Sequence, residues 1–332
     1  MVHIGNPLKR RHRLRHLLKN AFFRLYRLCL RCGFHLIPDH YYASLPNILD
    51  LERTRESWAG RSELPGISID VDEQVESLTA VCLPYKAEYL GNAIFKEAVS
   101  RLGSGYGYIE AQVLHAVIRS YKPRRIIEVG SGVSTYCMAA ASRLNSAEGG
   151  SPCHITSIEP FPSDGLKALS GITVKQVQVQ SVPVETFTEL EQNDLLFIDS
   201  SHAVRPGGDV NYLVLEILPR LRPGVVVHFH DICFPYDYQR DLLHTCLFSS
   251  ETSLLRAFLI SNDRVKILFA LSLLHYDRAA VLKTLFPGYD PQPSTDGLRN
   301  DASGADQHFP SSIYLQIRAQ SESRLSSGPR FA

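Results

Sequence analysis

Two short segments that combine carboxylate and imidazole side chains each follow an apolar run. Asp199 and His202 come directly after residues 195–198, and His230 and Asp231 come after residues 225–229. Apolar runs of this length are candidate buried strands. In an open α/β sheet, ligands bind outside the carboxyl ends of the strands. Carboxylates and histidines at such an edge can hold a divalent cation or move a proton.

A glycine-rich turn stands between another apolar run and a helical pattern. Gly130 and Gly132 allow a tight turn and a close approach of the backbone to a ligand. The N-terminus of the following helix offers unpaired N–H groups. Thr135 occupies the place of the third glycine of a dinucleotide motif, so the pattern departs from that motif. The alternative is a tight turn that binds no ligand.

An acidic residue ends the next apolar run. Glu159 closes the segment 154–160 and lies 29 residues after Gly130. A carboxylate at that strand end can accept hydrogen bonds from both hydroxyls of a ribose. Further along, Gln180 either contacts an adenine or simply ends a strand. We expect His228 to be a core histidine with satisfied hydrogen bonds, and Cys233 to be a packing residue.

The elements that must position these residues alternate along the chain. Helical patterns are expected near residues 72–83, 109–121, 134–144 and 209–221. Strands are expected within residues 124–130, 154–160, 172–179, 194–199, 224–230, 264–270 and 312–318. Strands that alternate with helices predict βαβ units and a doubly wound parallel sheet.

The charge of the chain is divided unevenly. The 332 residues hold 35 Lys and Arg against 34 Asp and Glu, but the first 32 residues contain nine basic groups and no acidic one. The remaining 300 residues therefore carry a formal charge of −8. A mildly acidic body argues against general binding of nucleic acid.

The basic N-terminal segment has the pattern of an amphipathic helix that stops at Gly33. Apolar residues between Leu14 and Cys32 recur at helical spacing, and arginines fall largely opposite them. We expect residues 8–32 to pack on the body, to form a homodimer, or to contact an anionic membrane surface. A targeting role is a further alternative.

The cysteines give an expectation for the compartment. There are seven, scattered along the chain, and only Cys29 and Cys32 form a CxxC pair. This pattern favours free thiols in a reducing compartment. No apolar run has the length of a membrane span. We therefore expect a cytoplasmic protein, with contact to the inner face of the membrane as an alternative.

The motifs EVGSGVST, SIEP, DLLFIDSSH and LPRLRPGVVVHFHDICFP together resemble a class I S-adenosylmethionine-dependent methyltransferase of the family 24 type, over about residues 34–320. This resemblance implies an α/β fold with a Rossmann-like, seven-stranded, mostly parallel sheet whose last strand is antiparallel. It implies that the glycine turn meets the methionine part of S-adenosylmethionine, that Glu159 binds the ribose, and that Gln180 lies near the adenine. The expected cofactor-binding residues are Glu128, Gly130, Ser131, Gly132, Ser134, Thr135, Glu159, Gln180 and Asp199.

The ends of the fourth and fifth strands are also similar to those of the metal-dependent, catechol-type O-methyltransferases. That similarity implies catalytic roles for His202, as general base, and His230, and a divalent cation on Asp199, His230 and Asp231. The chain differs by having histidine where the base is usually lysine, and His-Asp where the pair is usually Asp-Asn. Carboxylates suit Mg²⁺, whereas an imidazole favours Mn²⁺, Fe²⁺ or Zn²⁺. The alternative is a metal-free site in which Asp199 contacts the cofactor's amino group.

The resemblance predicts methylation of a hydroxyl on a small-molecule or sugar-like acceptor. The alternatives are a metal enzyme similar to the cephalosporin hydroxylases and a non-catalytic, membrane-peripheral scaffold that binds S-adenosylmethionine. The expected organisation is a basic helical arm (1–33), a cap or lid (34–107), the methyltransferase domain (108–320) and a flexible tail (321–332).

Overall fold

The computed structural model describes residues 7–291, 296–299 and 309–319, with side chains from residue 18 onward. The chain divides into two compact units, Met1–Arg55 and Glu56–Ala332. This division differs from the boundaries expected at residues 33 and 107, because residues 56–107 join the same unit as the sheet. The predicted tail, 321–332, lies outside the described residues.

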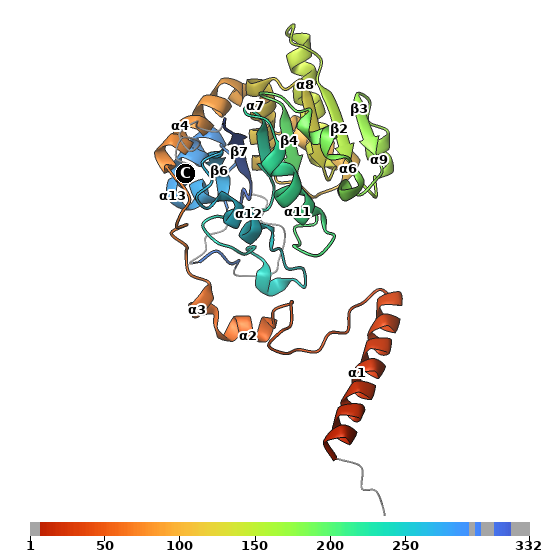
Figure 1. The fold of residues 1–332 in the computed structure, drawn as a ribbon. Coiled ribbons are helices and arrows are strands. Elements are labelled where there is room, and N and C mark those ends of the chain that lie inside the picture. Colours follow the sequence, from red (N-terminus) through yellow and green to blue (C-terminus); the bar gives the residue numbers. More distant parts are fainter. Residues whose placement is uncertain (1–6, 292–295, 300–308, 320–332) are drawn as a thin grey trace, which may run out of the picture. The chain divides into compact units, whose positions relative to one another are not determined.

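The first unit contains two helices, α1 (Pro7–Arg31) and α2 (Ile48–Arg53) (Figure 1). Gly33 follows α1 with a φ of +84°, a conformation that glycine adopts readily, and so ends the helix as predicted. The side chain of Asn47 caps α2 by accepting a hydrogen bond from the backbone N–H of Leu49 at 3.0 Å.

The second unit is built on one seven-stranded sheet with the order β3-β2-β1-β4-β5-β7-β6 (Figure 1). The first five strands are parallel, and β7 runs antiparallel to both β5 and β6. The predicted fold class is therefore confirmed, with each strand inside its expected segment. The strands are β1 (Arg125–Val129), β2 (His154–Ile158), β3 (Ile172–Lys175), β4 (Leu195–Ile198), β5 (Val226–Phe229), β6 (Val265–Ala270) and β7 (Ile313–Ile317).

Helices cover both faces of this sheet, so its central strands are apolar on both sides. One core contains residues of α4, α7, α8 and α13, and the other contains residues of η3 and α12. The longer helices of this unit are α4 (Val71–Cys82), α6 (Ala93–Leu102), α7 (Tyr108–Tyr121), α8 (Val133–Ala147), α12 (Glu251–Leu259) and α13 (Leu271–Leu285). The short helical segments are α3 (Arg55–Trp58), η1 (Leu83–Tyr85), α5 (Lys86–Tyr89), α9 (Asp164–Lys167), η2 (Val179–Ser181), α10 (Val184–Thr188) and η5 (Leu242–His244).

The prediction of a single helix over residues 209–221 is wrong in detail. The segment consists of a short α-helix, α11 (Asp209–Asn211), a π-helix, η3 (Tyr212–Ile217), and a 3₁₀ turn, η4 (Leu218–Arg220). Pro219 has no N–H to donate, so regular α-helical hydrogen bonding cannot continue through it. The apolar residues Leu213, Val214 and Ile217 are nevertheless buried, as the amphipathic pattern required.

Within the described part of the chain, no helix is both long enough and apolar enough to cross a membrane.

Candidate functional site

The glycine turn after β1 lies against the end of β4. Gly130 has a φ of +90°, and a Cβ at that position would lie 2.0 Å from the carbonyl oxygen of Asp199. No other residue fits such a close approach. Gly132 has a φ of +141°, but a Cβ there would meet nothing within 4 Å. The first glycine is therefore required by packing, whereas the second leaves the turn open to a ligand.

Three of the predicted cofactor residues are bonded to one another beneath this turn. Ser134 and Thr135 each donate a hydroxyl hydrogen bond of 2.7 Å to the carboxyl group of Glu128, which is fully buried. Burial raises the pKa of Glu128 to about 8, although the hydrogen bonds from Thr135 and Ser134 act in the opposite direction. In this structure the three side chains brace the start of α8, and their contact with a cofactor stays a prediction.

Glu159, at the end of β2, lies beside the same turn. The hydroxyl of Ser131 donates to its Oε2 at 3.2 Å, and the backbone N–H of Phe161 donates to its Oε1 at 2.8 Å. The carboxylate is half-buried. The structure thus brings Ser131 and Glu159 together, as expected for two parts of one binding site. Gln180 lies in η2, where its amide donates to the carbonyl oxygen of Gly207 at 2.8 Å.

The ends of β4 and β5 bring His230 between three carboxyl groups. Its Nε2 lies 3.0 Å from Glu110 Oε2, and its Nδ1 lies 3.3 Å from Asp199 Oδ1 and 3.6 Å from Asp231 Oδ1. Glu110 belongs to α7, so this contact ties the helix before β1 to the edge of β5. His230 is buried, so a positive charge on its ring needs the negative charge of the neighbouring carboxyl groups to balance it.

His202 completes the cluster from the loop after β4. Its Nδ1 lies 2.8 Å from Glu251 Oε2, and its Nε2 lies 3.3 Å from Asp199 Oδ1 and 3.6 Å from Asp231 Oδ2. Glu251, the first residue of α12, is fully buried. His202 and Asp231 have φ values of +57° and +56°, which are uncommon for residues other than glycine. Strained backbone of this kind is concentrated at functional sites.

The imidazoles and the carboxyl groups shift each other's pKa values. Burial on its own would lower the pKa of His202, but the hydrogen bonds with Asp199 and Glu251 and the charge of Asp231 raise that pKa to about 10. Burial acts to raise the pKa of Asp199, but the charge of His230 and the hydrogen bonds from both histidines lower it well below its usual range. The cluster is therefore a set of strongly interacting charged groups.

The same groups have the donor atoms of a cation site. Asp199, His202 and His230 each offer one ligand atom, and these three atoms all lie within 4.8 Å of one another. The sequence predicted Asp199, His230 and Asp231 instead. Asp231 lies next to this set, since its carboxylate oxygens are 3.6 Å from each imidazole.

Four side chains that contact the cluster are absent from the sequence expectations: Glu110, Glu251, Ser311 and Ser312. The hydroxyl of Ser311 donates to Asp231 Oδ1 at 2.8 Å, and the hydroxyl of Ser312 donates to Glu110 Oε1. Glu110 carries the one signal that could have been used, because it is an isolated acid at the start of a long apolar helical run. An acid in such a run needs a buried partner.

His228 is buried on the same side of β5 as His230. Its ring stacks on Phe197 with centroids 4.3 Å apart. Neither ring nitrogen has a hydrogen-bond partner among the described residues. The expectation of a core position is confirmed, whereas the expectation of satisfied hydrogen bonds is wrong. Cys233 is buried as well, which agrees with its expected packing role.

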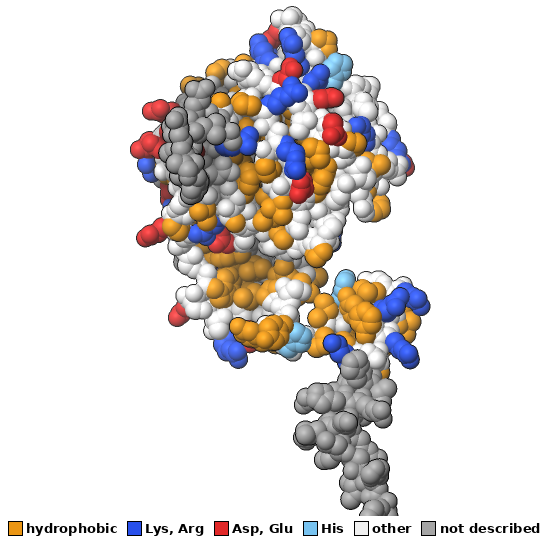
Figure 2. Space-filling view, in the orientation of Figure 1, with side chains coloured by type: hydrophobic (Ala, Val, Ile, Leu, Met, Phe, Trp, Pro, Cys, Tyr) orange, Lys and Arg blue, Asp and Glu red, His pale blue; other side chains and the backbone are white. Residues whose placement is uncertain are grey.

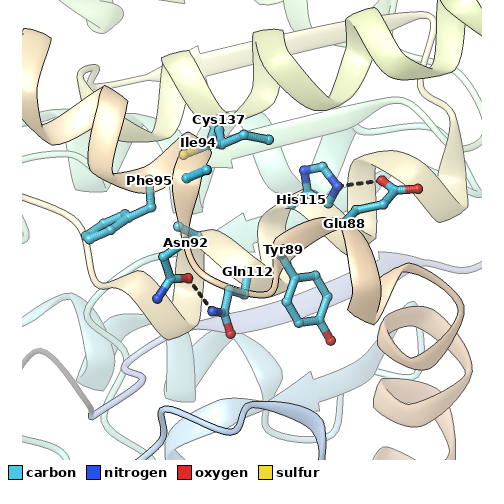
Figure 3. A pocket seen from close by; sticks show the side chains of 10 residues that line it. Glu88, Tyr89, Asn92, Ile94, Phe95, Gln112, His115 and Cys137 are labelled. Atoms are coloured by element: carbon cyan, nitrogen blue, oxygen red, sulfur yellow. Dashed lines mark hydrogen bonds and ion pairs between the residues drawn. The ribbon is translucent and has the colours of Figure 1, made fainter.

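A separate pocket lies among α5, α6, α7 and α8 (Figure 3). Its polar side chains are largely bonded to each other: His115 Nε2 lies 2.7 Å from Glu88 Oε2, and Gln112 donates to Asn92. Arg119 also donates to Glu88, at 2.8 Å. The residues lining this pocket include no predicted site residue, so the candidate site remains the carboxyl edge of the sheet.

Comparisons with known proteins bear on this edge directly. Residues 127–232 match the family 24 model described as a methyltransferase domain, a range that begins within β1 and includes both the glycine turn and the His230–Asp231 segment. An uncharacterised protein of Archaeoglobus fulgidus is 26% identical over 181 residues, which cover 47% of this chain and 74% of that protein.

Two solved structures are similar at low identity. One is the Podospora anserina methyltransferase PaMTH1 with SAH bound (14% identity, 83% of this chain and 99% of that chain, TM-score 0.36). The other is the MycE methyltransferase of the mycinamycin biosynthetic pathway, in complex with Mg, SAH and mycinamycin VI (12% identity, 80% of this chain and 67% of that chain, TM-score 0.34). Both TM-scores are below 0.5, so the assignment depends on the family match. The match of residues 127–232 to the methyltransferase-domain model agrees with the family 24 type that the sequence motifs indicated.

Proposed function

We propose that the protein transfers the methyl group of S-adenosylmethionine to a hydroxyl oxygen of a small-molecule or sugar-like acceptor. The observation that carries this proposal is the placement of two kinds of site on one edge of the sheet. The open turn at Gly132 and the carboxylate of Glu159 suit the donor. The imidazoles of His202 and His230 suit the chemistry of the acceptor.

The donor half has the features that an adenosyl ligand needs. The backbone of Gly132 is open on the side where a Cβ would lie. Glu159 is held in place by Ser131 and by the N–H of Phe161, and it is half-buried, so a ribose can reach it. Gln180, at η2, is the proposed neighbour of the adenine, and the carboxylate of Asp199 borders both halves of the edge.

The proton of the acceptor hydroxyl is proposed to pass to His202 in its neutral form. Despite burial, the surrounding carboxyl groups alone raise the pKa of this imidazole to about 10, and a cation held beside it would lower that pKa. Its Nδ1 is bonded to Glu251, so its Nε2 is the nitrogen that faces Asp199 and Asp231. As the O–H bond breaks, the oxygen forms a bond to the methyl carbon. The bond between that carbon and the sulfonium sulfur breaks, and its electron pair stays on the sulfur. Alignment of the three atoms and removal of the proton are the two tasks left to the protein.

The donor set also fits a divalent cation. Four carboxyl groups surround two imidazoles here, and the donor atoms of Asp199, His202 and His230 already converge. Of this cluster, Asp199, His230 and Asp231 are the proposed ligands of the cation. His202, whose donor atom also converges on Asp199 and His230, is the proposed base. When bound, such an ion lowers the pKa of the acceptor hydroxyl. A mixed imidazole and carboxylate set suits Mn²⁺, Fe²⁺ or Zn²⁺ as well as Mg²⁺.

A screen with methyl-labelled S-adenosylmethionine tests the proposal. The full chain is incubated with a panel of hydroxylated acceptors, and the products are examined by NMR for a new O-methyl carbon. Transfer to oxygen that His202→Ala reduces and His244→Ala leaves unchanged supports the proposal. His244 is exposed and lies outside the cluster, so its variant is a matched control. Transfer to nitrogen or carbon alone, or an equal rate in His202→Ala, contradicts it.

A further inference from the structure

Most of the described large apolar side chains of α1 are exposed, although Cys29 is buried. Leu18, Phe22, Leu25 and Leu28 follow each other at helical spacing, and Leu18 and Leu28 are 62% and 55% exposed. In α7, by contrast, every residue from Tyr108 to Arg119 is buried. A row of exposed large apolar residues on one helix face marks a contact with a partner or a membrane.

The charge of the same helix is of one sign. Arg24, Arg27 and Arg31 share the face opposite to Leu18 and Leu25, and the first 32 residues contain nine basic groups and no acidic one. Figure 2 shows hydrophobic side chains next to Lys and Arg side chains on the described part of this helix. An apolar stripe beside a basic face is the pattern of a helix that lies in the interface of an anionic bilayer.

The segment after α1 adds exposed aromatic rings. Phe34 is exposed, and the side chains of Tyr41 and Tyr42 are 94% and 86% exposed. Tyrosine rings are enriched at the boundary between lipid and water because they combine an apolar body with a polar tip. The exposed apolar surface of the first unit therefore continues beyond its long helix.

From these observations we infer that residues 18–42 form a docking surface for an anionic membrane, on which α1 lies parallel to the bilayer plane. The apolar face enters the boundary between headgroups and acyl chains, while the arginines contact the headgroups. Pairing of α1 with α1 of a second copy is less compatible with the charges. Such pairing would cover the apolar faces but leave the arginines on the opposite faces without an anionic partner, because neither helix contains an acidic residue.

Flotation of the full chain with vesicles tests this inference. The probe is phosphatidylcholine alone, compared with a mixture of phosphatidylcholine and phosphatidylglycerol. We expect binding to the anionic vesicles, weak binding to the neutral ones, and weaker binding at high salt. The triple change Arg24→Gln, Arg27→Gln and Arg31→Gln removes three charges and should weaken binding about a hundredfold. The double change Phe22→Ser and Leu25→Ser should weaken it by at least about tenfold.

The matched control changes exposed apolar residues of the second unit. Leu215→Ser and Leu247→Ser remove side chains that are 51% and 74% exposed, and binding should not change. Two results would overturn the inference. One is the absence of binding to anionic vesicles by the intact chain. The other is a dimer in solution that Phe22→Ser with Leu25→Ser dissociates while vesicle binding stays the same.

Discussion

At the ends of β1 and β2, acidic groups accept hydrogen bonds from hydroxyls and backbone N–H groups. Glu128 is bonded to Ser134 and Thr135, and Glu159 is bonded to Ser131. At the ends of β4 and β5, carboxyl groups instead surround imidazoles, and His202 and His230 each lie within 4 Å of three of them.

This contrast separates two tasks on one sheet edge. In the β1–β2 half, hydroxyl and N–H donors and the glycine backbone hold a shape into which a ligand fits, and these donors do not titrate near neutral pH. A cluster of charged groups can instead take up a proton or hold a cation. Changes in the β1–β2 half should therefore alter donor affinity, and changes in the β4–β5 half should alter the rate.

The largest expected effect is on the rate of methyl transfer when the proposed base, His202, is replaced. His202→Ala should lower the rate of methyl transfer by roughly 10²–10⁴-fold, the usual contribution of a general base. The affinity for S-adenosylmethionine should stay within a factor of about two, because the side chain faces Glu251 and Asp231 and not the glycine turn. Single-turnover kinetics and calorimetry on the same preparation measure the two quantities. A loss of donor affinity as large as the loss of rate would contradict the assignment of donor binding to one half of the edge and of the chemical step to the other.

A smaller effect is expected at the cation ligands. Asp231→Asn should weaken the binding of Mn²⁺, measured by electron paramagnetic resonance without any acceptor, by about 10–100-fold, a range typical of a disturbed metal site. Asp164→Asn, which changes a fully exposed acid, is the control and should bind Mn²⁺ as the unmodified chain does. Equal Mn²⁺ binding in all three proteins would show that Asp231 is not a ligand of the cation. The absence of Mn²⁺ binding by the unmodified chain would leave a metal-free site.

A change at Glu159 should alter the affinity for the donor and leave the rate at saturating donor nearly unchanged. Glu159→Ala should weaken the binding of S-adenosylmethionine by about 1–3 kcal/mol, because the ribose hydroxyls and Ser131 lose their acceptor. At saturating donor the rate should be close to that of the unmodified protein. Glu189→Ala changes an exposed acid distant from the turn and is expected to have no effect on calorimetry. A drop in saturated rate without a drop in affinity would place Glu159 in the chemical step.

The smallest effect concerns the stability of the turn. Burial raises the pKa of Glu128 from 4.5 to about 8, so the folded chain binds this proton more tightly than the unfolded chain does. The contribution is complete below pH 4.5 and is lost as the pH rises toward 8. We expect the free energy of unfolding to fall over this range by at most about 1.4 kcal/mol per pH unit from this group. Glu128→Gln should flatten that slope in urea titrations at several pH values, and an unchanged slope would show that the carboxyl group is ionised in the fold.

Much of the architecture could be predicted, because it depends on local patterns. Short, mainly apolar runs located all seven strands, and the adjacency of β4 and β5 brought Asp199 and Asp231 to one edge. Glu110 and Glu251 could not be assigned, since they reach the cluster from α7 and α12 and their contacts depend on how those helices pack. The π-helix at Tyr212–Ile217 was missed because amphipathic spacing alone does not distinguish it from an α-helix.

Calorimetry of the unmodified chain with S-adenosylmethionine, and separately with NAD, tests the central claim most directly because it needs no acceptor. Donor binding depends on the open turn at Gly132 and on the acceptor oxygens of Glu159. We predict binding of S-adenosylmethionine in the micromolar range, no binding of NAD, and a clear loss in Glu159→Ala. Binding of NAD without binding of S-adenosylmethionine would contradict the assignment of this sheet edge to methyl transfer.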